Sequence, residues 1–583
     1  MSDKRPLDLV LVWHMHQPDY RDYATGEFTR PWVYLHAIKD YTDMAGLLER
    51  CPGVSAVINL APVLLDQLED YADQFATGQF RDPLLKLLSR DGERPLSAAE
   101  RDVIFDQCFH ANRDHMITAF PMYQALHDLF VRLESQGPTA LAYLSDQYMF
   151  DLLTWYHLSW LGETVRRESD TFSKFVAVGA GFTRAHRWEL LRLIGRKTSE
   201  LIPRYRRLSE SGKVELSTSP YNHPLAPLLI DFRSALESLP DSPLPVATEY
   251  PGGAARVGLH IALAIGSHMR RFGAPPAGLW PAEGAVSEAM LKQVAARDFK
   301  WTASSESVLA NTMRRREGRP YLRTADLHRP YRLAGASDGL VCFFRDEHLS
   351  DLIGFQYATW RGEDAAAHLV GELEVIAAAA PVGERPVVSI ILDGENAWES
   401  YPYNGFYFLS SLYDQLESHP SIRTHTYQKY LALRDDPPPQ VRVGTAMATP
   451  AYAAVGELHG LVAGSWVYGN FSTWIGSPDK NRAWDLLVAA KRAHDAVLSD
   501  GLLSSVEIEA ARRQLSDCEG SDWFWWFGDY NAADAVAYFD RLYRMKLSNL
   551  YTCLRLPAPA ALQQPISVGK GDPESGGSMR RAT

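Results

Sequence analysis

One nearly continuous apolar stretch ends in a cluster of carboxylates and constrains the fold of the whole chain. Residues 387–392 are mostly apolar and β-branched, which is typical of a strand buried on both faces. The stretch ends in Asp393-Gly394-Glu395. Carboxylates at this point must face a cleft, because burying an unpaired charge is costly. In a barrel of parallel strands, the carboxyl ends of the strands form the catalytic face.

A second stretch further upstream repeats this design. Residues 278–282 form a short apolar run that is followed by Glu283, and each carboxylate has a tryptophan close by, Trp280 or Trp398. Two carboxylates at two strand ends with aromatic neighbours are typical of glycoside hydrolases. For either carboxylate alone, a salt bridge or a helix N-cap is an equally good interpretation. The repetition of the pattern favours a catalytic pair.

Strands and helices alternate along much of the chain. Strands are expected at residues 7–13, 56–60, 213–217, 278–282, 299–303 and 387–392, and helices at residues 185–209, 255–272, 286–297 and 362–380. This alternation predicts a parallel α/β fold, and a chain of 583 residues favours a closed barrel. A mainly helical stretch at about residues 84–161 predicts an insertion, with a capping box at Ser97–Glu100.

The C-terminal part of the chain has a different pattern. Three prolines at residues 437–439 mark a linker, which we assign to residues 435–440. Strands are not expected beyond about Pro450, and apolar stripes predict helices at residues 479–498, 504–515 and 531–554. We therefore expect a catalytic barrel over residues 1–434, an all-α domain over residues 441–562 that completes the substrate site, and a disordered tail over residues 563–583.

Composition excludes several classes of protein. A net charge of -12 argues against a nucleic-acid partner, and the absence of an 18-residue apolar window argues against a membrane span. The five cysteines are scattered without CxxC spacing, which indicates reduced thiols. The apolar run at residues 7–13 is too short for a signal peptide. We therefore expect a cytoplasmic protein, and the pattern calls for no cofactor.

The first strand is followed by two histidines that allow two interpretations. His14 and His16 are expected on one face of the strand end. His-x-His at this place is also how barrel metallohydrolases present two metal ligands, so a metal centre competes with sugar binding and with a satisfied polar core. Gln17 has both a donor and an acceptor, which suits hydroxyl recognition better than metal binding.

Further candidates for sugar binding come from single residues and one aromatic run. Glu215 and Glu395 are weaker carboxylate candidates, and spacing alone does not choose between Glu395 and Asp393. Residues 523–527 are five consecutive aromatics, which cannot all face one core. Either they lie at an interface or some of them, such as Trp523 and Trp525, line a sugar groove.

Five ordered segments support a more specific interpretation. They are residues 14–18 (HMHQP), 212–217 (GKVELS), 278–284 (GLWPAEG), 392–399 (LDGENAWE) and 520–526 (GSDWFWW). Together they resemble family 57 of the glycoside hydrolases, which contains alpha-amylases, amylopullulanases, 4-alpha-glucanotransferases and branching enzymes. The resemblance implies an incomplete barrel of seven strands followed by a helical domain.

The resemblance also implies a mechanism and a substrate. Glu283 becomes the nucleophile and Asp393 the general acid/base of a retaining reaction that needs no metal, with His16, Trp280 and Asp522 in the substrate site. The sequence of residues 219–224 is most similar to that of the alpha-amylase and amylopullulanase branch. This segment includes His223, which the resemblance implies is a further substrate contact. The implied substrate is an alpha-1,4-glucan, and a glucanotransferase or branching enzyme on the same scaffold is the alternative.

Overall fold

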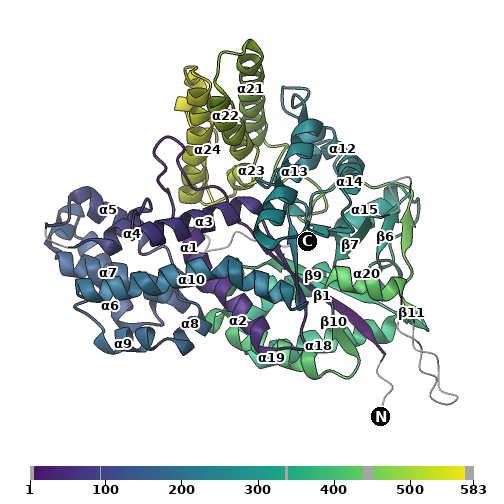
Figure 1. Ribbon diagram of the computed structural model, residues 1–583, viewed down its shortest axis with the longest axis horizontal. Coiled ribbons are helices and arrows are strands. Elements are labelled where there is room, and N and C mark those ends of the chain that lie inside the picture. The colour runs from purple at the N-terminus through teal and green to yellow at the C-terminus, as the bar shows by residue number, and fades with distance from the viewer. Residues whose placement is uncertain (1–4, 92–93, 335–338, 437–450, 572–583) are drawn as a thin grey trace.

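A ring of seven parallel strands lies at the centre of the computed structural model, which describes residues 5–91, 94–334, 339–436 and 451–571 (Figure 1). The strands are β1 (Leu7–Met15), β2 (Ala56–Leu60), β3 (Val214–Thr218), β4 (Gly278–Leu279), β5 (Trp301–Ser305), β7 (Val341–Arg345) and β9 (Val387–Asp393). The ring closes because β9 pairs with β1 along its whole length and with β7 at Ser389 and Arg345. The predicted incomplete (β/α)7 barrel is confirmed.

Alternate residues of the strands fill the interior of the barrel. Val10 and Val12 of β1 belong to one buried cluster with Val387 and Ile391 of β9, whereas the residues between them join the outer core beneath the helices. Both strands are therefore buried on both faces, which explains their continuous apolar sequences. The period of two residues along a strand also turns Asp393 toward the interior, on the same face as Ile391.

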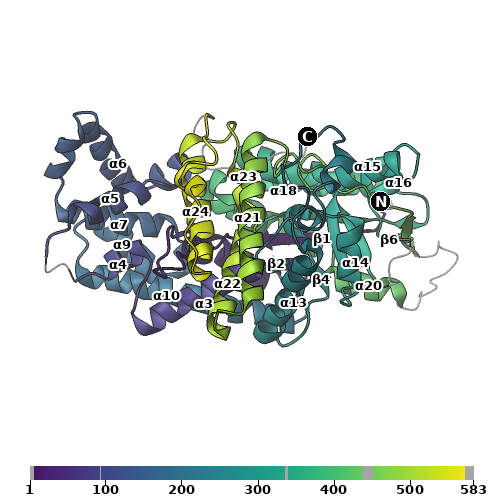
Figure 2. The ribbon, with the colours of Figure 1, turned by 90° about the horizontal axis from the view of Figure 1, so that it is seen from above.

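Helices follow the strands and surround the barrel (Figures 1 and 2). The main ones are α2 (Thr42–Arg50), α3 (Pro62–Thr77), α10 (Arg184–Glu210), α13 (Gly253–Phe272), α14 (Glu288–Ala295), α15 (Glu306–Arg315), α18 (Gly362–Ala379), α19 (Phe406–Ser418) and α20 (Tyr427–Asp435). The four helices predicted between residues 185 and 380 are α10, α13, α14 and α18. Of the helices in the described part of the chain, none has the length and apolar character needed to cross a bilayer.

The helices between β2 and β3 extend to one side of the barrel, on the left in Figure 1. They include α4 (Pro83–Ser89), α5 (Ala98–Gln107), α6 (Pro121–Glu134), α7 (Asp146–Ser159), α8 (Glu163–Glu168) and α9 (Asp170–Val178). The predicted capping box is present at the start of α5, where the side chains of Ser97 and Glu100 each accept from the other's backbone N–H. The helical insertion therefore continues past residue 161 as far as α10.

The C-terminal helices lie over the junction between the insertion and the barrel (Figures 1 and 2). They are α21 (Pro478–Asp500), α22 (Ser505–Cys518), α23 (Asp522–Trp526) and α24 (Ala533–Cys553). Three of them correspond to the helices predicted from apolar stripes. The short helix α23 lies at the base of the group, next to the barrel, so the aromatic run is carried to the contact between the two parts.

Three expectations about the C-terminal part need correction or fall outside the described residues. Short strands do occur beyond Pro450, since β12 (Gly456–Leu458) pairs with β6 (Tyr331–Leu333). Part of the predicted disordered tail is ordered: Ile566 is buried, and its backbone N–H donates to the carboxylate of Asp540 on α24 at 2.6 Å. Most of the predicted linker at 435–440, together with residues 572–583, lies outside the described part of the chain.

Candidate active site

A cavity of about 800 Å³ opens at the carboxyl ends of the barrel strands. The barrel, the insertion and the C-terminal helices all contribute to its walls. It brings together these predicted site residues: His14, His16, Gln17, His223, Glu283, Asp393, Glu395, Asp522 and Trp525. Two of these residues, His16 and Asp522, are hydrogen-bonded across 506 positions of the sequence, and the convergence of the whole set makes this cavity the candidate active site.

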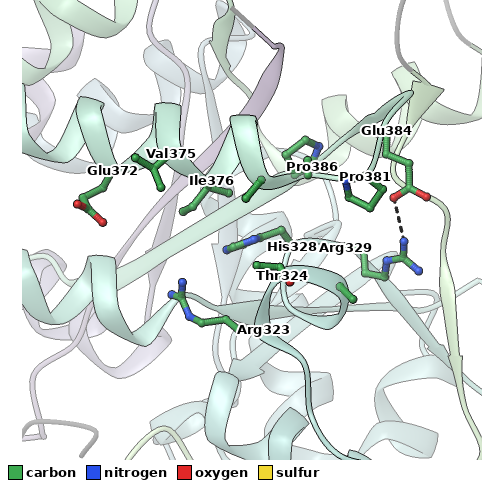
Figure 3. Close-up of a pocket in the computed structure, with 13 residues that line it drawn as sticks. Arg323, Thr324, His328, Arg329, Glu372, Val375, Ile376, Pro381, Glu384 and Pro386 are labelled. Atoms are coloured by element: carbon green, nitrogen blue, oxygen red, sulfur yellow. Dashed lines mark hydrogen bonds and ion pairs between the residues drawn. The ribbon is translucent and has the colours of Figure 1, made fainter.

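A smaller cavity of about 150 Å³ lies elsewhere, between α18 and residues 323–329 (Figure 3). Its charged groups are engaged within the protein: Arg329 pairs with Glu384 at 2.9 Å, and His328 pairs with Asp346 at 2.9 Å. None of the predicted site residues lines this cavity.

Glu283 lies in a short turn, Ala282–Gly284, four residues beyond the end of β4 at Leu279. Both of its carboxylate oxygens accept hydrogen bonds, one from the hydroxyl of Ser521 at 3.0 Å and one from the indole N–H of Trp466 at 3.1 Å. Burial, reinforced by the negative charges of Asp522 and Asp393, raises the pKa of Glu283 to about 8, although the two donors oppose this shift.

Asp393 is the last residue of β9 and pairs in register with His14 of β1. Its carboxylate accepts from the side-chain amide of Asn396 at 2.7 Å. Burial raises the pKa of Asp393 to about 6, and the amide of Asn396 and the charge of Arg345 limit the rise. Glu283 and Asp393 thus face one cavity from two strand ends with pKa values on either side of neutrality.

Glu395 is a third carboxyl group in the same wall of the cavity. Its Oε1 accepts from the backbone N–H of His16 at 3.1 Å, the hydroxyl of Tyr41 at 3.0 Å and the amide of Gln17 at 3.3 Å. Burial and the neighbouring charge of Asp393 raise the pKa of Glu395 well above its usual range. Burial therefore favours the neutral form of this carboxyl group.

Three imidazole rings stack beside the carboxyl groups. The centroid of the His223 ring lies 3.9 Å from the ring centroid of His16 and 5.0 Å from that of His14. His14 bonds to the Asn59 side chain through Nδ1 at 2.6 Å, and burial lowers the pKa of His14 to about 3. Burial also lowers the pKa of His223 well below its usual range. These two histidines are therefore neutral at physiological pH.

Three side chains of the cavity lie close enough together to be considered as metal ligands. Ligand atoms of His16, His223 and Asp522 all lie within 4.8 Å of one another, which is close enough for a metal centre. The rings of His16 and His223 are stacked with an angle of 20° between their planes, so their in-plane lone pairs run side by side and do not converge on one point. Nε2 of His16 contacts Asp522 at 2.9 Å instead. This arrangement favours hydrogen bonding to a polar substrate.

Several residues predicted to bind substrate do not line the cavity: Glu215, Trp280, Trp398 and Trp523. Glu215 stands near the start of β3, and its carboxylate accepts from the indole of Trp301 at 2.5 Å and from the backbone N–H of Gln428 at 2.9 Å. The three tryptophans are fully buried core residues. Motif membership alone could not separate wall residues from residues that support the wall.

Other wall residues were not predicted. They include Arg30, Trp32, Phe109, Trp160, Arg345, Phe355, Asn396, Trp466, Trp526 and Tyr538. Arg345 ends strand β7, so the same strand-end signal that identified Asp393 could have identified it. Trp466 lies in an irregular segment with no such signal, and only long-range folding brings it to the site.

Comparisons with known proteins identify the family and support the fold. The sequence profile described as glycosyl hydrolase family 57 matches residues 10–444. Among solved structures, a family 57 branching enzyme from Thermococcus kodakaraensis is similar with a TM-score of 0.54 and 15% identity, covering 97% of this chain and 99% of the other. A family 57 branching enzyme from Pyrococcus horikoshii gives 0.52 and 15%, covering 99% of both chains.

An alpha-amylase from Thermotoga maritima gives a TM-score of 0.52 and 13% identity, covering 94% of both chains. A comparison with curated protein sequences finds no match. At such low identity the structural likeness establishes the fold alone, whereas the sequence profile extends over about three quarters of the chain. The chain belongs to glycosyl hydrolase family 57.

Proposed function

We propose that this protein is a retaining glycoside hydrolase that acts on alpha-1,4-glucans, such as glycogen or maltodextrin in the cytoplasm. The observation that carries the proposal is that Glu283 and Asp393 face one aromatic-walled cavity from two strand ends. Trp32, Trp160 and Tyr538 offer ring surfaces on which sugar faces can stack.

The proposed reaction has two steps. Glu283 attacks the anomeric carbon while Asp393 donates its proton to the departing glycosidic oxygen, which leaves a covalent glycosyl-enzyme. Asp393, now ionised, then removes a proton from water, and the water displaces Glu283 from the sugar. His16, Asp522 and Glu395 surround the carboxyl pair and would bind hydroxyls of the reacting sugar.

A glucanotransferase or branching enzyme is the second candidate. Two of the solved structures similar to this chain are named branching enzymes. Phe109 of the insertion and Tyr538 of α24 also line the cavity, and in this candidate function a second glucan would bind there as acceptor. In such an enzyme a glucan hydroxyl replaces water in the second step.

Incubation with maltooligosaccharides, glycogen and pullulan tests the proposal and separates the two candidates. A hydrolase should increase the number of reducing ends as products shorten, whereas a transferase should redistribute chain lengths with few new reducing ends.

Both activities should persist in EDTA, because the proposed mechanism uses no metal. Activity that is lost on chelation and restored by zinc would support a metallohydrolase using His14 and His16. Beta-anomer product at early times would contradict the retaining mechanism.

The two raised pKa values predict a bell-shaped pH dependence of kcat/KM. Catalysis requires Glu283 ionised and Asp393 protonated. Below about pH 6 both groups carry protons, and above about pH 8 both have lost them, so activity should fall on each side of a maximum near pH 7. Because the pKa of Glu283 is the higher, only a minority of the molecules hold the single proton on Asp393 at the optimum. A maximum below pH 5 would contradict this ionisation scheme.

A further inference from the structure

The backbone at Glu283 adopts a conformation that an isolated chain would avoid. Glu283 has φ 58° and ψ 25°, and Gly284 follows with φ 57°. The left-handed region is unfavourable for a residue with a side chain, so other contacts must hold the turn in place. They come from a segment nearly 200 positions further along the chain.

Residues 464–466 bind the turn through backbone hydrogen bonds. Val286 and Gly464 exchange two of them, at 2.9 and 3.2 Å, and the N–H of Trp466 donates to the carbonyl of Glu283 at 3.0 Å. Glycine is required at 464, since a Cβ there would lie 2.4 Å from the carbonyl oxygen of Gly469. The turn is therefore fixed on the side that faces the C-terminal part of the chain.

The side chain of Glu283 is held from the same side, and the hydrogen count fixes the direction of each bond. Trp466 can only donate, through its indole N–H. When Glu283 is ionised, its carboxylate can only accept, so the single hydroxyl hydrogen of Ser521 is used for Glu283 and Ser521 accepts from Nδ1 of His223, 3.0 Å away. In this state His223 is the Nδ1–H tautomer, and the relay runs from His223 through Ser521 to Glu283.

We propose that Trp466 and Ser521 form a clamp, named here the nucleophile clamp, that positions Glu283 for attack and favours its ionised form. Both residues act through Glu283 and are positioning residues. The inference rests on the proposed function, in which Glu283 is the nucleophile. It adds that the two hydrogen-bond donors that hold this carboxylate and favour its ionised form lie C-terminal to the last barrel strand, β9.

The clamp has a consequence that simple structural damage would not produce. Each donor stabilises the carboxylate over the neutral acid, so removing one should raise the pKa of Glu283 by about one unit. The alkaline limb of the kcat/KM profile should then move up by about one pH unit. Because fewer molecules hold the proton on Asp393, the maximum should also fall about tenfold. The acidic limb, set by Asp393, should stay in place.

The experiment compares Ser521→Ala with Ser521→Thr, which keeps the hydroxyl, and Trp466→Phe with Trp188→Phe. The indole N–H of Trp188 on α10 is buried and bonds to no described residue, so its loss serves as a matched control. The kcat/KM profile of each variant is measured on an activated aryl alpha-maltoside, together with its melting temperature. Ser521→Ala and Trp466→Phe should show the shifted alkaline limb. Ser521→Thr should keep that limb at its wild-type position, and Trp188→Phe should follow the wild type throughout.

The outcomes separate the clamp from the function on which it rests. If the wild type is active but its alkaline limb stays fixed in Ser521→Ala and Trp466→Phe, the clamp is wrong and the proposed function stands. If the wild type neither turns over substrate nor becomes labelled at Glu283 by a 5-fluoro glycosyl fluoride, the proposed function itself fails. A slower rate of labelling in the two clamp variants, at unchanged melting temperature, would support the positioning role directly.

Discussion

Replacing Glu283 with Gln should lower kcat by about 10⁴-fold or more on every substrate, because no other group can form the covalent intermediate. Asp393→Asn should behave differently. On glucans it should lose about 10²–10⁴-fold, as expected for a missing general acid. On a glycosyl fluoride, whose leaving group needs little protonation, the first step should remain fast and the glycosyl-enzyme should accumulate. Burst kinetics and mass spectrometry measure this difference.

Both variants should fold normally, because the amides match the shape of the carboxyl groups they replace. The raised pKa of Glu283 means that the folded state favours the neutral acid, so this group stabilises the fold below about pH 4.5 and loses that contribution as pH rises through about 8. Glu283→Gln should therefore be at least as stable as the wild type at pH 9. Full activity in either single variant would remove the assignment of the catalytic pair.

Replacing Glu519 with Gln should produce the largest loss of stability. Glu519 is completely buried, and its carboxylate accepts from Arg256 at 2.6 and 2.7 Å, from His260 at 2.8 Å and from the hydroxyl of Tyr250 at 2.5 Å. The substitution leaves Arg256 buried without a counter-ion, which typically costs about 3–5 kcal/mol. The melting temperature and urea unfolding measure the loss.

The same network joins α13 of the barrel to the end of α22, one residue before the Gly520–Asp522 turn. Activity should therefore fall together with stability in the Glu519 variant. Glu210→Gln, which breaks an exposed pair with Arg206 on α10, is the matched control and should change stability little. Replacing Arg256 with Met in the Glu519→Gln background should restore part of the stability, since it removes the orphaned charge. A melting temperature that stays at the wild-type value would refute the role of this network.

Local sequence patterns could predict the barrel and the placing of carboxylates at its strand ends, because both depend on neighbours in the chain. Asp393 ends the apolar run of β9, and the two-residue period of a strand turns its side chain inward. This direction can be inferred from the sequence of the one strand. The aromatic run at 523–527 was also informative: Trp523, Phe524 and Phe527 are buried, whereas Trp525 and Trp526 reach the cavity.

Contacts across hundreds of residues could not be predicted in this way. The two bonds to the Glu283 carboxylate come from Trp466 and Ser521, and neither residue has a local pattern that identifies its partner. Glu215 illustrates the opposite error. It belongs to a motif and carries a charge, yet its place near the start of β3 points it at Trp301 and away from the cavity.

The bond between His16 and Asp522 spans 506 positions of the chain, and this separation bears on when the enzyme can first work. During synthesis on the ribosome, at about 5–20 residues per second, roughly 25–100 s pass between the appearance of these two residues. The barrel strands can pair during that time, but Glu283 and His16 still lack the partners supplied by Ser521 and Asp522. A nascent chain therefore lacks these partners of Glu283 and His16 until at least 522 of its 583 residues have been synthesised.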